Sequence, residues 1–242
     1  MKIALIGGTG SIGKGFALRW GQKHQVIVGS RNQEKAQVRA AEYNGILKDH
    51  GFKANITGEI NAKAALEADV VLLAIRYGQI ASTIEQIKSG LPGKVIISVV
   101  VPMEKNSCII VPGGVSFEIS ASSREDYKSD YFCYVMPPLG SAAQEIAALL
   151  PEGAIELVSA FHTVPAAKLS NLDIELDYDI GICGNSMYSK SIVFDLVRDI
   201  PGMRPRDIGP LETSSMIESI TPLLVNVAVR NNMKNVGIKF VE

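Results

Sequence analysis

Three glycines near the start of the chain are spaced as in loops that bind the pyrophosphate of a dinucleotide. Gly8, Gly10 and Gly13 form the pattern GxGxxG directly after the apolar run at residues 2–6. Such a loop needs glycine because it turns tightly, lets the pyrophosphate approach the main chain and lets the next helix pack closely on the strand. The N-terminus of that helix adds free N–H groups and a positive dipole end. We therefore expect a dinucleotide here; a glycine turn that binds no nucleotide is the alternative.

The residues after the second apolar run favour NADP(H) over NAD. Proteins that prefer NAD usually carry an Asp or Glu about 20 residues after the glycines, which binds the ribose 2′-hydroxyl. Here the strand end has no acid, and Ser30, Arg31 and Lys35 offer a hydroxyl and two cations that suit a 2′-phosphate. Thr9 in the glycine loop offers a further hydroxyl. The alternative is that Arg31 and Lys35 are solvated charges in the first turn of a helix. There they would oppose the helix dipole, and no bound anion would offset this cost.

Other candidate residues follow later apolar runs, where an open α/β sheet binds its ligand. The stretches 74–77 and 99–102 offer small or apolar side chains to a flat nicotinamide ring, although ordinary sheet packing explains them equally well. His162 follows the last expected strand, between Phe161 and Val164. It is either a general acid or a residue that orients its loop through hydrogen bonds.

The residues that usually protonate a substrate are missing. None of the 7 tyrosines has a lysine four residues on, as in short-chain dehydrogenases, and no Asp–His dyad is evident. Reduction of a ketone or an imine usually needs such a donor. Hydride transfer between two stacked cofactor rings needs orientation instead. We therefore expect no catalytic acid or base.

The elements that must position these residues alternate over the first hundred residues. Apolar runs at 2–6, 25–28, 70–75 and 94–100, with a weaker one at 54–57, are typical of strands buried on both faces. Helices are expected between them at 12–21, 33–49, 62–68 and 79–88. The alternation predicts right-handed βαβ units and an α/β fold with a doubly wound, mostly parallel Rossmann sheet.

The pattern changes in the second half of the chain. Prolines and glycines interrupt residues 102–138, which indicates an irregular hairpin or surface excursion. A helix at 142–150 and a strand at 154–160 then complete the sheet. Further on we expect strands near 179–183 and 205–208, a helix at 187–199 and an apolar helix at 211–231, kinked by Pro222. The expected domains are an NADP-binding domain over 1–160, with the excursion at about 103–141, and a small α+β capping domain over 161–242.

Composition excludes several functional classes. With 24 basic and 25 acidic residues the formal net charge is −1, which argues against binding to nucleic acid or to an anionic membrane. No apolar stretch approaches the roughly 18 residues of a membrane span, and the N-terminus has a strand pattern, not that of a signal peptide. The 3 cysteines and 3 histidines are scattered, which predicts reduced thiols and no metal site. We expect a cytoplasmic protein.

Several longer motifs occur together in one known family. They are Gly7-Gly8-Thr9-Gly10, Val28-Gly29-Ser30-Arg31, Phe161-His162-Thr163-Val164-Pro165-Ala166-Ala167, and Gly209-Pro210-Leu211 with Ile217-Glu218-Ser219-Ile220-Thr221-Pro222-Leu223. In these motifs the chain resembles the NADPH-dependent coenzyme F420 reductases (F420H2:NADP oxidoreductases) of archaea and some bacteria, except over about residues 103–141. The resemblance implies reversible hydride transfer between the deazaflavin ring of F420 and the nicotinamide of NADP, in a homo-oligomer.

The resemblance also implies a role for each matching residue. The 2′-phosphate would be held by Thr9, Ser30, Arg31 and Lys35, and the pyrophosphate by Gly8, Gly10, Ser11, Ile12 and Gly13. Ile75, Arg76, Val100, Val101 and Ala160 would lie near the nicotinamide, His162, Val164 and Ala166 would place the deazaflavin, and Leu211 would close the pocket behind the rings. Two other functions remain open: an NADPH-dependent reductase of another acceptor (ferric ion, imine or hydroxyacid) and a non-catalytic NADP sensor.

Overall fold

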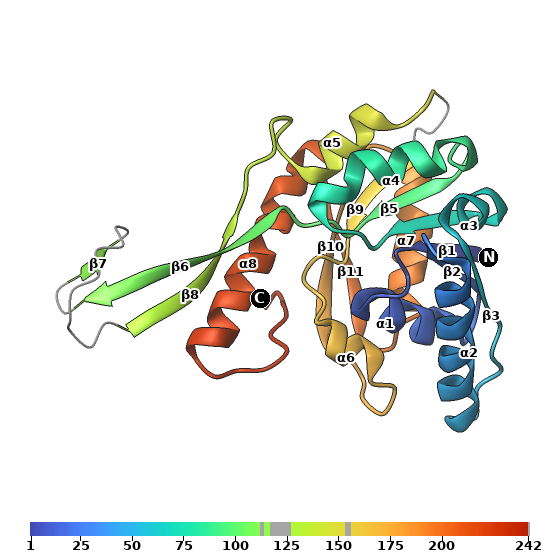
Figure 1. Cartoon of the computed structure of the whole chain (residues 1–242), viewed down its shortest axis with the longest axis horizontal. Coiled ribbons are helices and arrows are strands. Elements are labelled where there is room, and N and C mark those ends of the chain that lie inside the picture. Colours follow the sequence, from blue (N-terminus) through green and yellow to red (C-terminus); the bar gives the residue numbers. More distant parts are fainter. Residues whose placement is uncertain (112–113, 117–126, 153–155, 242) are drawn as a thin grey trace.

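The computed structural model describes residues 1–111, 114–116, 127–152 and 156–241 (Figure 1). Among them, eight strands form one sheet in the order β11-β10-β9-β5-β4-β1-β2-β3. Six of these strands are parallel: β1 (Lys2–Ile6), β2 (Gln25–Ser30), β3 (Ile56–Ile60), β4 (Val70–Leu73), β5 (Val95–Ser98) and β9 (Glu156–Ala160). β10 (Tyr178–Gly184) runs antiparallel to β9, and β11 (Met203–Gly209) is parallel to β10. The predicted doubly wound, mostly parallel sheet is confirmed.

Helices cover both faces of the sheet because its central strands are apolar on both. Ile3 and Leu5 pack on one face with α1 (Ser11–Trp20), α2 (Gln33–Asp49) and α7 (Met187–Arg198). Ala4 and Ile6 pack on the other with α3 (Asn61–Glu67), α4 (Ile80–Ile87) and α5 (Ala142–Leu149). Successive residues of a strand point to opposite faces, so a strand covered on both sides is a continuous apolar run. Short 3₁₀ turns, η1 (Tyr77–Gln79) and η2 (Lys88–Gly90), flank α4.

The strand expected at 54–57 lies further along, at Ile56–Ile60. β3 is the edge strand of the sheet, and its Thr57 and Ile60 are exposed, so its apolar run is not continuous. Gly58 lies directly beneath α2, where a Cβ atom would come within 2.3 Å of the main chain of Ala36. The strand therefore continues through Gly58, where α2 lies too close for a side chain, and through Glu59.

Residues 102–138 contain a regular hairpin, which we call the arm. β6 (Met103–Val111) pairs antiparallel with β8 (Tyr127–Tyr134) without a register shift from Met103 to Ile110, and β7 (Gly114–Ser116) pairs with the far end of β6. In Figure 1 the arm projects away from the sheet beside α8 (Ser214–Arg230). The expected hairpin is confirmed, but its pairing is regular where an irregular one was expected. Residues 112–113 and 117–126 of this stretch lie outside the described residues.

The C-terminal part of the chain adds to the main sheet instead of forming one of its own. β10 and β11 extend the sheet beyond β9, and α6 (Ala166–Ser170), α7 and α8 accompany them. The expected long helix consists of a 3₁₀ turn, η3 (Leu211–Thr213), followed by α8, which continues through Pro222. The division into two domains at residue 160 therefore stays a prediction.

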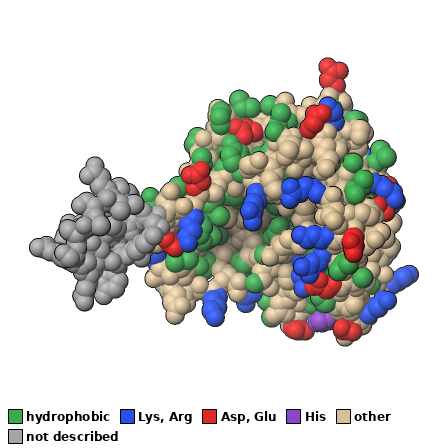
Figure 2. Space-filling view, viewed as in Figure 1, with side chains coloured by type: hydrophobic (Ala, Val, Ile, Leu, Met, Phe, Trp, Pro, Cys, Tyr) green, Lys and Arg blue, Asp and Glu red, His purple; other side chains and the backbone are tan. Residues whose placement is uncertain are grey.

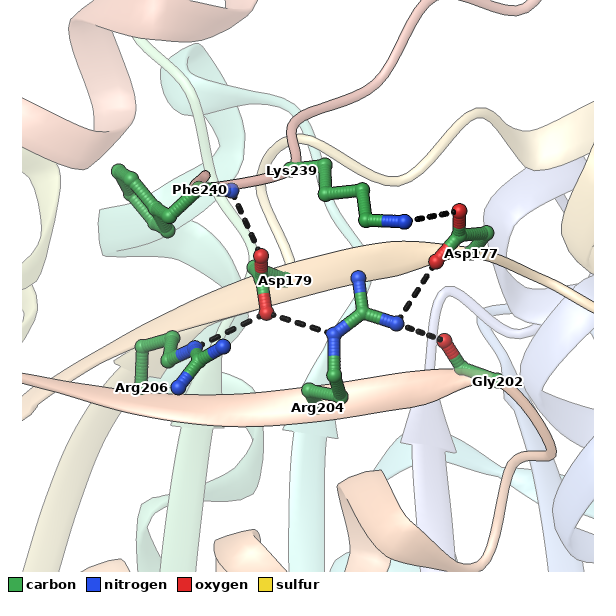
Figure 3. Close-up of polar contacts among 7 residues, drawn as sticks. All are labelled: Asp177, Asp179, Gly202, Arg204, Arg206, Lys239 and Phe240. Atoms are coloured by element: carbon green, nitrogen blue, oxygen red, sulfur yellow. Dashed lines mark hydrogen bonds and ion pairs between the residues drawn. The ribbon is translucent and has the colours of Figure 1, made fainter. Parts of the chain in front are cut away.

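A buried carboxylate fastens the end of the chain to β10 and β11 (Figure 3). Asp179 accepts hydrogen bonds from the main-chain N–H of Phe240 at 2.7 Å and from Nε of Arg204 and Arg206 at 3.0 and 2.9 Å. Burial raises the pKa of Asp179, but these hydrogen bonds outweigh it and hold the pKa below its usual value. Asp177 accepts from Arg204 and Lys239 beside it. The last residues are therefore an integral part of the fold.

Candidate dinucleotide-binding site

A cleft of about 640 Å³ lies along the carboxyl ends of the parallel strands. The residue that ends or directly follows each of these strands lines it: Gly7, Ser30, Asn61, Ala74, Val99 and Phe161. Figure 2 shows the corresponding face of the molecule, which is hollowed near its middle, with Lys and Arg side chains around the hollow. Open α/β sheets bind their ligands at this edge.

The loop between β1 and α1 is shaped by its glycines. Gly7 has a φ of +76°, and a Cβ atom there would lie 2.6 Å from the carbonyl oxygen of Ala74. A Cβ atom on Gly13 would lie 2.5 Å from Cα of Gly8, so α1 begins in contact with the loop. Gly10 is the N-cap of α1, and no side chain caps this helix start. The first N–H groups of α1 are thus left for an external anion, which is the arrangement that holds phosphates in other dinucleotide sites.

Within the part of the chain that the structure describes, three cations and no carboxylate line the cleft. Arg31, Lys35 and Arg76 are its basic residues, and among the described residues none of the three forms an ion pair. Ser30 is buried beside them, and its Oγ accepts a hydrogen bond from the N–H of Asn32 at 3.2 Å. A row of cations without acidic partners fits an anionic ligand, and the absence of an acid at the end of β2 fits a 2′-phosphate.

Sequence analysis missed one polar wall of the cleft. Asn61 follows β3, and its Nδ2 donates to Oε1 of Gln86 at 3.1 Å. The other polar residues of this wall are Gln79, Ser82 and Thr83, which with Gln86 follow the spacing i, i+3, i+4, i+7. They form one face of α4 and its preceding turn, while Ile80, Ile84 and Ile87 bury the opposite face. This polar periodicity was visible in the sequence and could have identified the wall.

His162 lies between the cleft and a smaller, mostly apolar pocket of about 230 Å³ against α8. Burial lowers the pKa of His162 to about 3, so its ring is neutral at physiological pH. Nε2 lies 3.4 Å from Oγ of Ser159, and Nδ1 has no hydrogen-bond partner among the described residues. The main-chain carbonyl of His162 accepts a hydrogen bond from Thr221 of α8 at 2.9 Å. A neutral, buried imidazole supports the loop-orienting interpretation over that of a general acid.

The loop that carries His162 is held at both ends. Phe161 has a φ of +66°, uncommon for a residue with a side chain, and its ring packs edge-on against Phe16 and Trp20 of α1. Helix α6 follows the loop directly, and Arg19 of α1 fixes the end of this helix. It donates to the main-chain carbonyls of Leu169, Asn171 and Ile174. The helix that begins at the phosphate loop therefore also positions the His162 loop.

The structure brings most of the predicted site residues together. Those that line the cleft are Thr9, Gly10, Ile12, Ser30, Arg31, Lys35, Ile75, Arg76, Val101 and His162, and Val164 lines the apolar pocket. Gly8 and Gly13 are buried beneath the loop, Ser11 is exposed at the start of α1, and Ala166 is half-buried at the start of α6. Their contacts with a ligand stay predictions.

Three other predicted residues line neither the cleft nor the pockets beside it. Val100, Ala160 and Leu211 are buried in the hydrophobic clusters on the two faces of the sheet. Neighbouring side chains along an extended chain point to opposite sides. After β5, Val99 and Val101 therefore point to the side that lines the cleft, while Val100 points to the other side and packs in a hydrophobic cluster. Leu211, at the start of η3, packs in the same cluster as Val100.

A second adjoining pocket, of about 540 Å³, lies between the cleft and the base of the arm. It shares Ile75, Arg76 and Val101 with the cleft, and Met103 and Val135 of the arm complete its apolar lining. The cleft therefore opens into additional space on two sides. Within the described part of the chain, no three His, Cys, Asp or Glu side chains are grouped to hold a metal ion. Nor does that part contain a helix long and apolar enough to cross a membrane.

Sequence comparison relates nearly the whole chain to known enzymes. Residues 2–102 match the family model described as NADP oxidoreductase, coenzyme F420-dependent. The chain is 39% identical over 239 residues to the F420-dependent NADP reductase of Methanocaldococcus jannaschii, covering 99% of this chain and 97% of the relative. It is 33% identical over 240 residues to the enzyme of the same name from Methanothermobacter marburgensis, with the same coverage of 99% and 97%.

Solved structures share the fold at low sequence identity. A proposed F420-dependent NADP reductase from Arthrobacter has a TM-score of 0.71 at 19% identity and is covered over 100% of both chains. An imine reductase from Myxococcus stipitatus in complex with NADP+ has a TM-score of 0.61 at 10% identity, over 96% of this chain and 63% of the other. These likenesses show the fold alone. On the evidence of the near full-length sequence relatives, the chain belongs to the family of F420-dependent NADP oxidoreductases.

Proposed function

We infer that this protein transfers a hydride reversibly between reduced coenzyme F420 and NADP. The observation that carries the inference is the cleft along the strand ends. Among the residues that the structure describes, its lining holds three cations without an ion pair, an uncapped helix start and no carboxylate. In a chain 39% identical to an F420-dependent NADP reductase, this cleft is the site for NADP. NAD-specific sites place an acid where this chain has Ser30 and Arg31.

The residues around the cleft fit NADP from one end to the other. We assign the 2′-phosphate to Ser30, Arg31 and Lys35, with Thr9 as a further hydroxyl, and the pyrophosphate to the N–H groups at the start of α1. The polar face of α4 borders the same cleft and suits the adenosine part. Ile75 and Val101 offer an apolar wall to the nicotinamide.

When bound, the two coenzymes supply the hydride donor and the hydride acceptor. The protein contributes orientation, which for two well-placed reactants accounts for several orders of magnitude in rate. Ile75 and Val101 exclude water from the reacting ring face, and the His162 loop, with Val164, borders the space for the deazaflavin. The neutral ring of His162 neither supplies nor removes a proton at physiological pH.

A spectrophotometric assay tests this function. Purified protein is mixed with oxidised F420 and NADPH, and loss of the deazaflavin absorbance is followed, with NADH in a parallel reaction. We expect rapid reduction with NADPH and much slower reduction with NADH. Faster oxidation of NADPH by a cyclic imine, a hydroxyacid precursor or a ferric salt than by F420 would favour a reductase of another acceptor. Tight NADPH binding without turnover by any acceptor would identify a sensor.

We also propose that the protein is a homo-oligomer that associates through α8. Met216, Leu223 and Val229 on this helix are each more than half exposed, at 64%, 58% and 58%. Exposed apolar side chains clustered on one helix are typical of an interface. Light scattering after size exclusion should give at least a dimer that Leu223→Glu dissociates, while Met187→Glu on α7, an apolar residue that is 72% exposed, leaves it intact. A monomeric unaltered protein would contradict this proposal. A cytoplasmic location likewise stays a prediction.

A further inference from the structure

We propose that Glu218 is a positioning residue for the F420 half of the reaction. Its buried carboxylate fixes α8 against α5 and the arm, and α8 in turn holds the His162 loop at the edge of the cleft. This inference rests on the proposed function, because it concerns the binding of one of its two coenzymes. It assigns a role to a residue that lines neither the cleft nor the pockets beside it.

Glu218 joins three separate elements. Its side chain is completely buried, although α8 also carries the exposed Met216 and Leu223. Oε2 accepts hydrogen bonds from the N–H of Ala142 at 2.9 Å and from the hydroxyl of Tyr134 at 3.0 Å, and Oε1 accepts from the N–H of Ala143 at 3.0 Å. Ala142 and Ala143 are the first residues of α5, whose N–H groups have no partner within their own helix. Glu218 therefore caps α5 from a different helix and also anchors the base of the arm.

Pro222 makes these contacts more important for the position of α8. A proline has no N–H, so the carbonyl of Glu218, four residues earlier, lacks its usual helical hydrogen bond. Helix α8 is weakened at this turn, and the side chains of Glu218 and Thr221 anchor it there. Thr221 is three residues from Glu218 and thus lies on the same side of the helix. The two side chains fix one turn of α8 to two neighbours.

Thr221 transmits this position to the site. Its hydroxyl donates to the carbonyl of His162 at 2.9 Å, and both residues line the cleft and the apolar pocket. The far end of the loop is fixed independently by Arg19. If the turn at Glu218 moves, the carbonyl of His162 loses its hydrogen-bond donor, while the loop between β1 and α1 and the cations Arg31 and Lys35, which Glu218 does not contact, keep their positions. Loss of Glu218 should therefore affect F420 and spare NADP.

The ionisation of Glu218 adds a pH signature. Burial raises its pKa to about 7, although the hydrogen bonds from Ala142, Ala143 and Tyr134 oppose that rise. The other titratable groups that face it are Glu145 of α5, Tyr77 of η1 and Cys183 of β10. Above this pH the charged carboxylate binds its donors most strongly. We expect kcat/KM for F420 to fall as the pH decreases through about 7.

The experiment is steady-state kinetics of Glu218→Gln, which keeps the shape of the side chain and removes its charge. We expect KM for F420 to rise at least fivefold, KM for NADPH to stay within twofold, and the pH dependence of kcat/KM for F420 near 7 to disappear. Glu212→Gln, the same substitution at an exposed position on η3, is the matched control and should change neither KM. Equal changes in both KM values, or a retained pH dependence, would overturn the proposal.

Two milder variants keep the test decisive if Glu218→Gln fails to fold. Tyr134→Phe removes one donor to the carboxylate, and Thr221→Val removes the hydrogen bond to His162. Each should raise KM for F420 and not that for NADPH, and Thr221→Val should retain the pH dependence because Glu218 is intact. No selective effect in either variant would contradict the proposal. Absence of F420 turnover by the unaltered protein would overturn the function itself, and this inference with it.

Discussion

The side chain of Asn32 accepts a hydrogen bond from the main-chain N–H of Lys35 at 2.8 Å. The N-terminus of α2 is thus capped from within the protein, whereas that of α1, on the same cleft, has no side-chain cap. The two helix starts therefore serve a phosphate-bearing ligand differently. α1 offers main-chain N–H groups. At the start of α2 the N–H of Lys35 already has a partner, and the side chains of Lys35 and of Arg31, just before the helix, are offered instead.

Arg31→Ala should weaken NADPH binding without slowing the chemical step. A hydrogen bond to a charged group contributes roughly 1.5–3 kcal/mol, so we expect KM for NADPH to rise about 10- to 100-fold. Because the 2′-phosphate is remote from the reacting ring, the contact is equal in ground and transition states, and kcat should stay within about twofold. The preference for NADPH over NADH should fall by the same factor as KM rises.

Arg39→Ala is the matched control for Arg31. Arg39 lies on α2, the helix that follows Arg31, is exposed and donates to Glu42 away from the cleft. Its replacement should leave both kinetic constants unchanged. A similar KM for both variants would show that Arg31 does not contact the nucleotide.

His162 and Glu218 should make opposite contributions to the pH dependence of stability. The pKa of His162 is lowered to about 3, so between about 3 and its unfolded value of 6.5 the unfolded chain binds more protons and stability falls as the pH decreases. The pKa of Glu218 is raised to about 7, so between its unfolded value of 4.5 and about 7 the folded protein binds more protons and stability increases as the pH decreases. From pH 7 to 5 each contribution amounts to about 2 kcal/mol, and the two nearly cancel.

Urea denaturation at pH 5, 6 and 7 separates these contributions. Relative to the unaltered protein, Glu218→Gln should lose about 2 kcal/mol of stability between pH 7 and 5, and His162→Asn should gain about as much. Because each variant is compared with the same unaltered protein, the contributions of all other titrating groups to the pH dependence cancel. If the stability of both variants depends on pH as that of the unaltered protein does, burial does not shift the pKa values of Glu218 and His162 as described.

The central sheet could be predicted from the sequence because its strands are buried on both faces. β1, β4 and β5 are continuous apolar runs for that reason, and the expected ranges overlap the observed ones closely. The edge strand β3 was misplaced because one of its faces is exposed. Val100 and Ala160 were assigned to the cleft, but a shift of one residue along a strand reverses the face to which a side chain points. Which residues of a strand point to which face is determined by packing, and the apolar run alone does not reveal it.

Much of the phosphate site was also predictable, since its residues are close in sequence. Gly10, Ser30, Arg31 and Lys35 belong to two short motifs, and the structure places all of them on the cleft. Thr221 and His162 are 59 residues apart, and Glu218 and Ala142 are 76 apart. Nothing local in the sequence indicates such pairs. They depend on how α8 packs against α5 and the His162 loop, which only the folded chain shows.

Gly7→Ala should destabilise the protein, in contrast to Gly45→Ala. At Gly7 the φ of +76° disfavours a side chain, and the new Cβ would lie 2.6 Å from the carbonyl oxygen of Ala74. We expect a loss of about 2 kcal/mol or more, together with weaker NADPH binding. Gly45 lies within α2, and a Cβ there would have no atom within 4 Å, so alanine should stabilise the helix by about 0.5–1 kcal/mol. Thermal unfolding of both variants measures the contrast, and a harmless Gly7→Ala would disprove the close approach of the loop to β4.

Asp179→Asn should release the end of the chain, whereas Asp177→Asn should not. The Asp179 side chain has an exposed fraction of 0% and accepts from Arg204, Arg206 and Phe240, while that of Asp177 is 63% exposed. Breaking a buried charged network costs about 3 kcal/mol, whereas an exposed ion pair contributes about 0–1 kcal/mol.

Hydrogen exchange provides the direct measurement of this release. The N–H of Asp179 donates to the carbonyl of Ile238 at 2.8 Å, so the tail and β10 protect one another. In Asp179→Asn, the amides of residues 237–240 should exchange at least tenfold faster, and urea denaturation should show the larger loss of stability. In Asp177→Asn both should stay close to those of the unaltered protein. Equal exchange in the two variants would mean that the ring of Tyr178, against which Gly237 packs, fastens the tail without the help of the buried carboxylate.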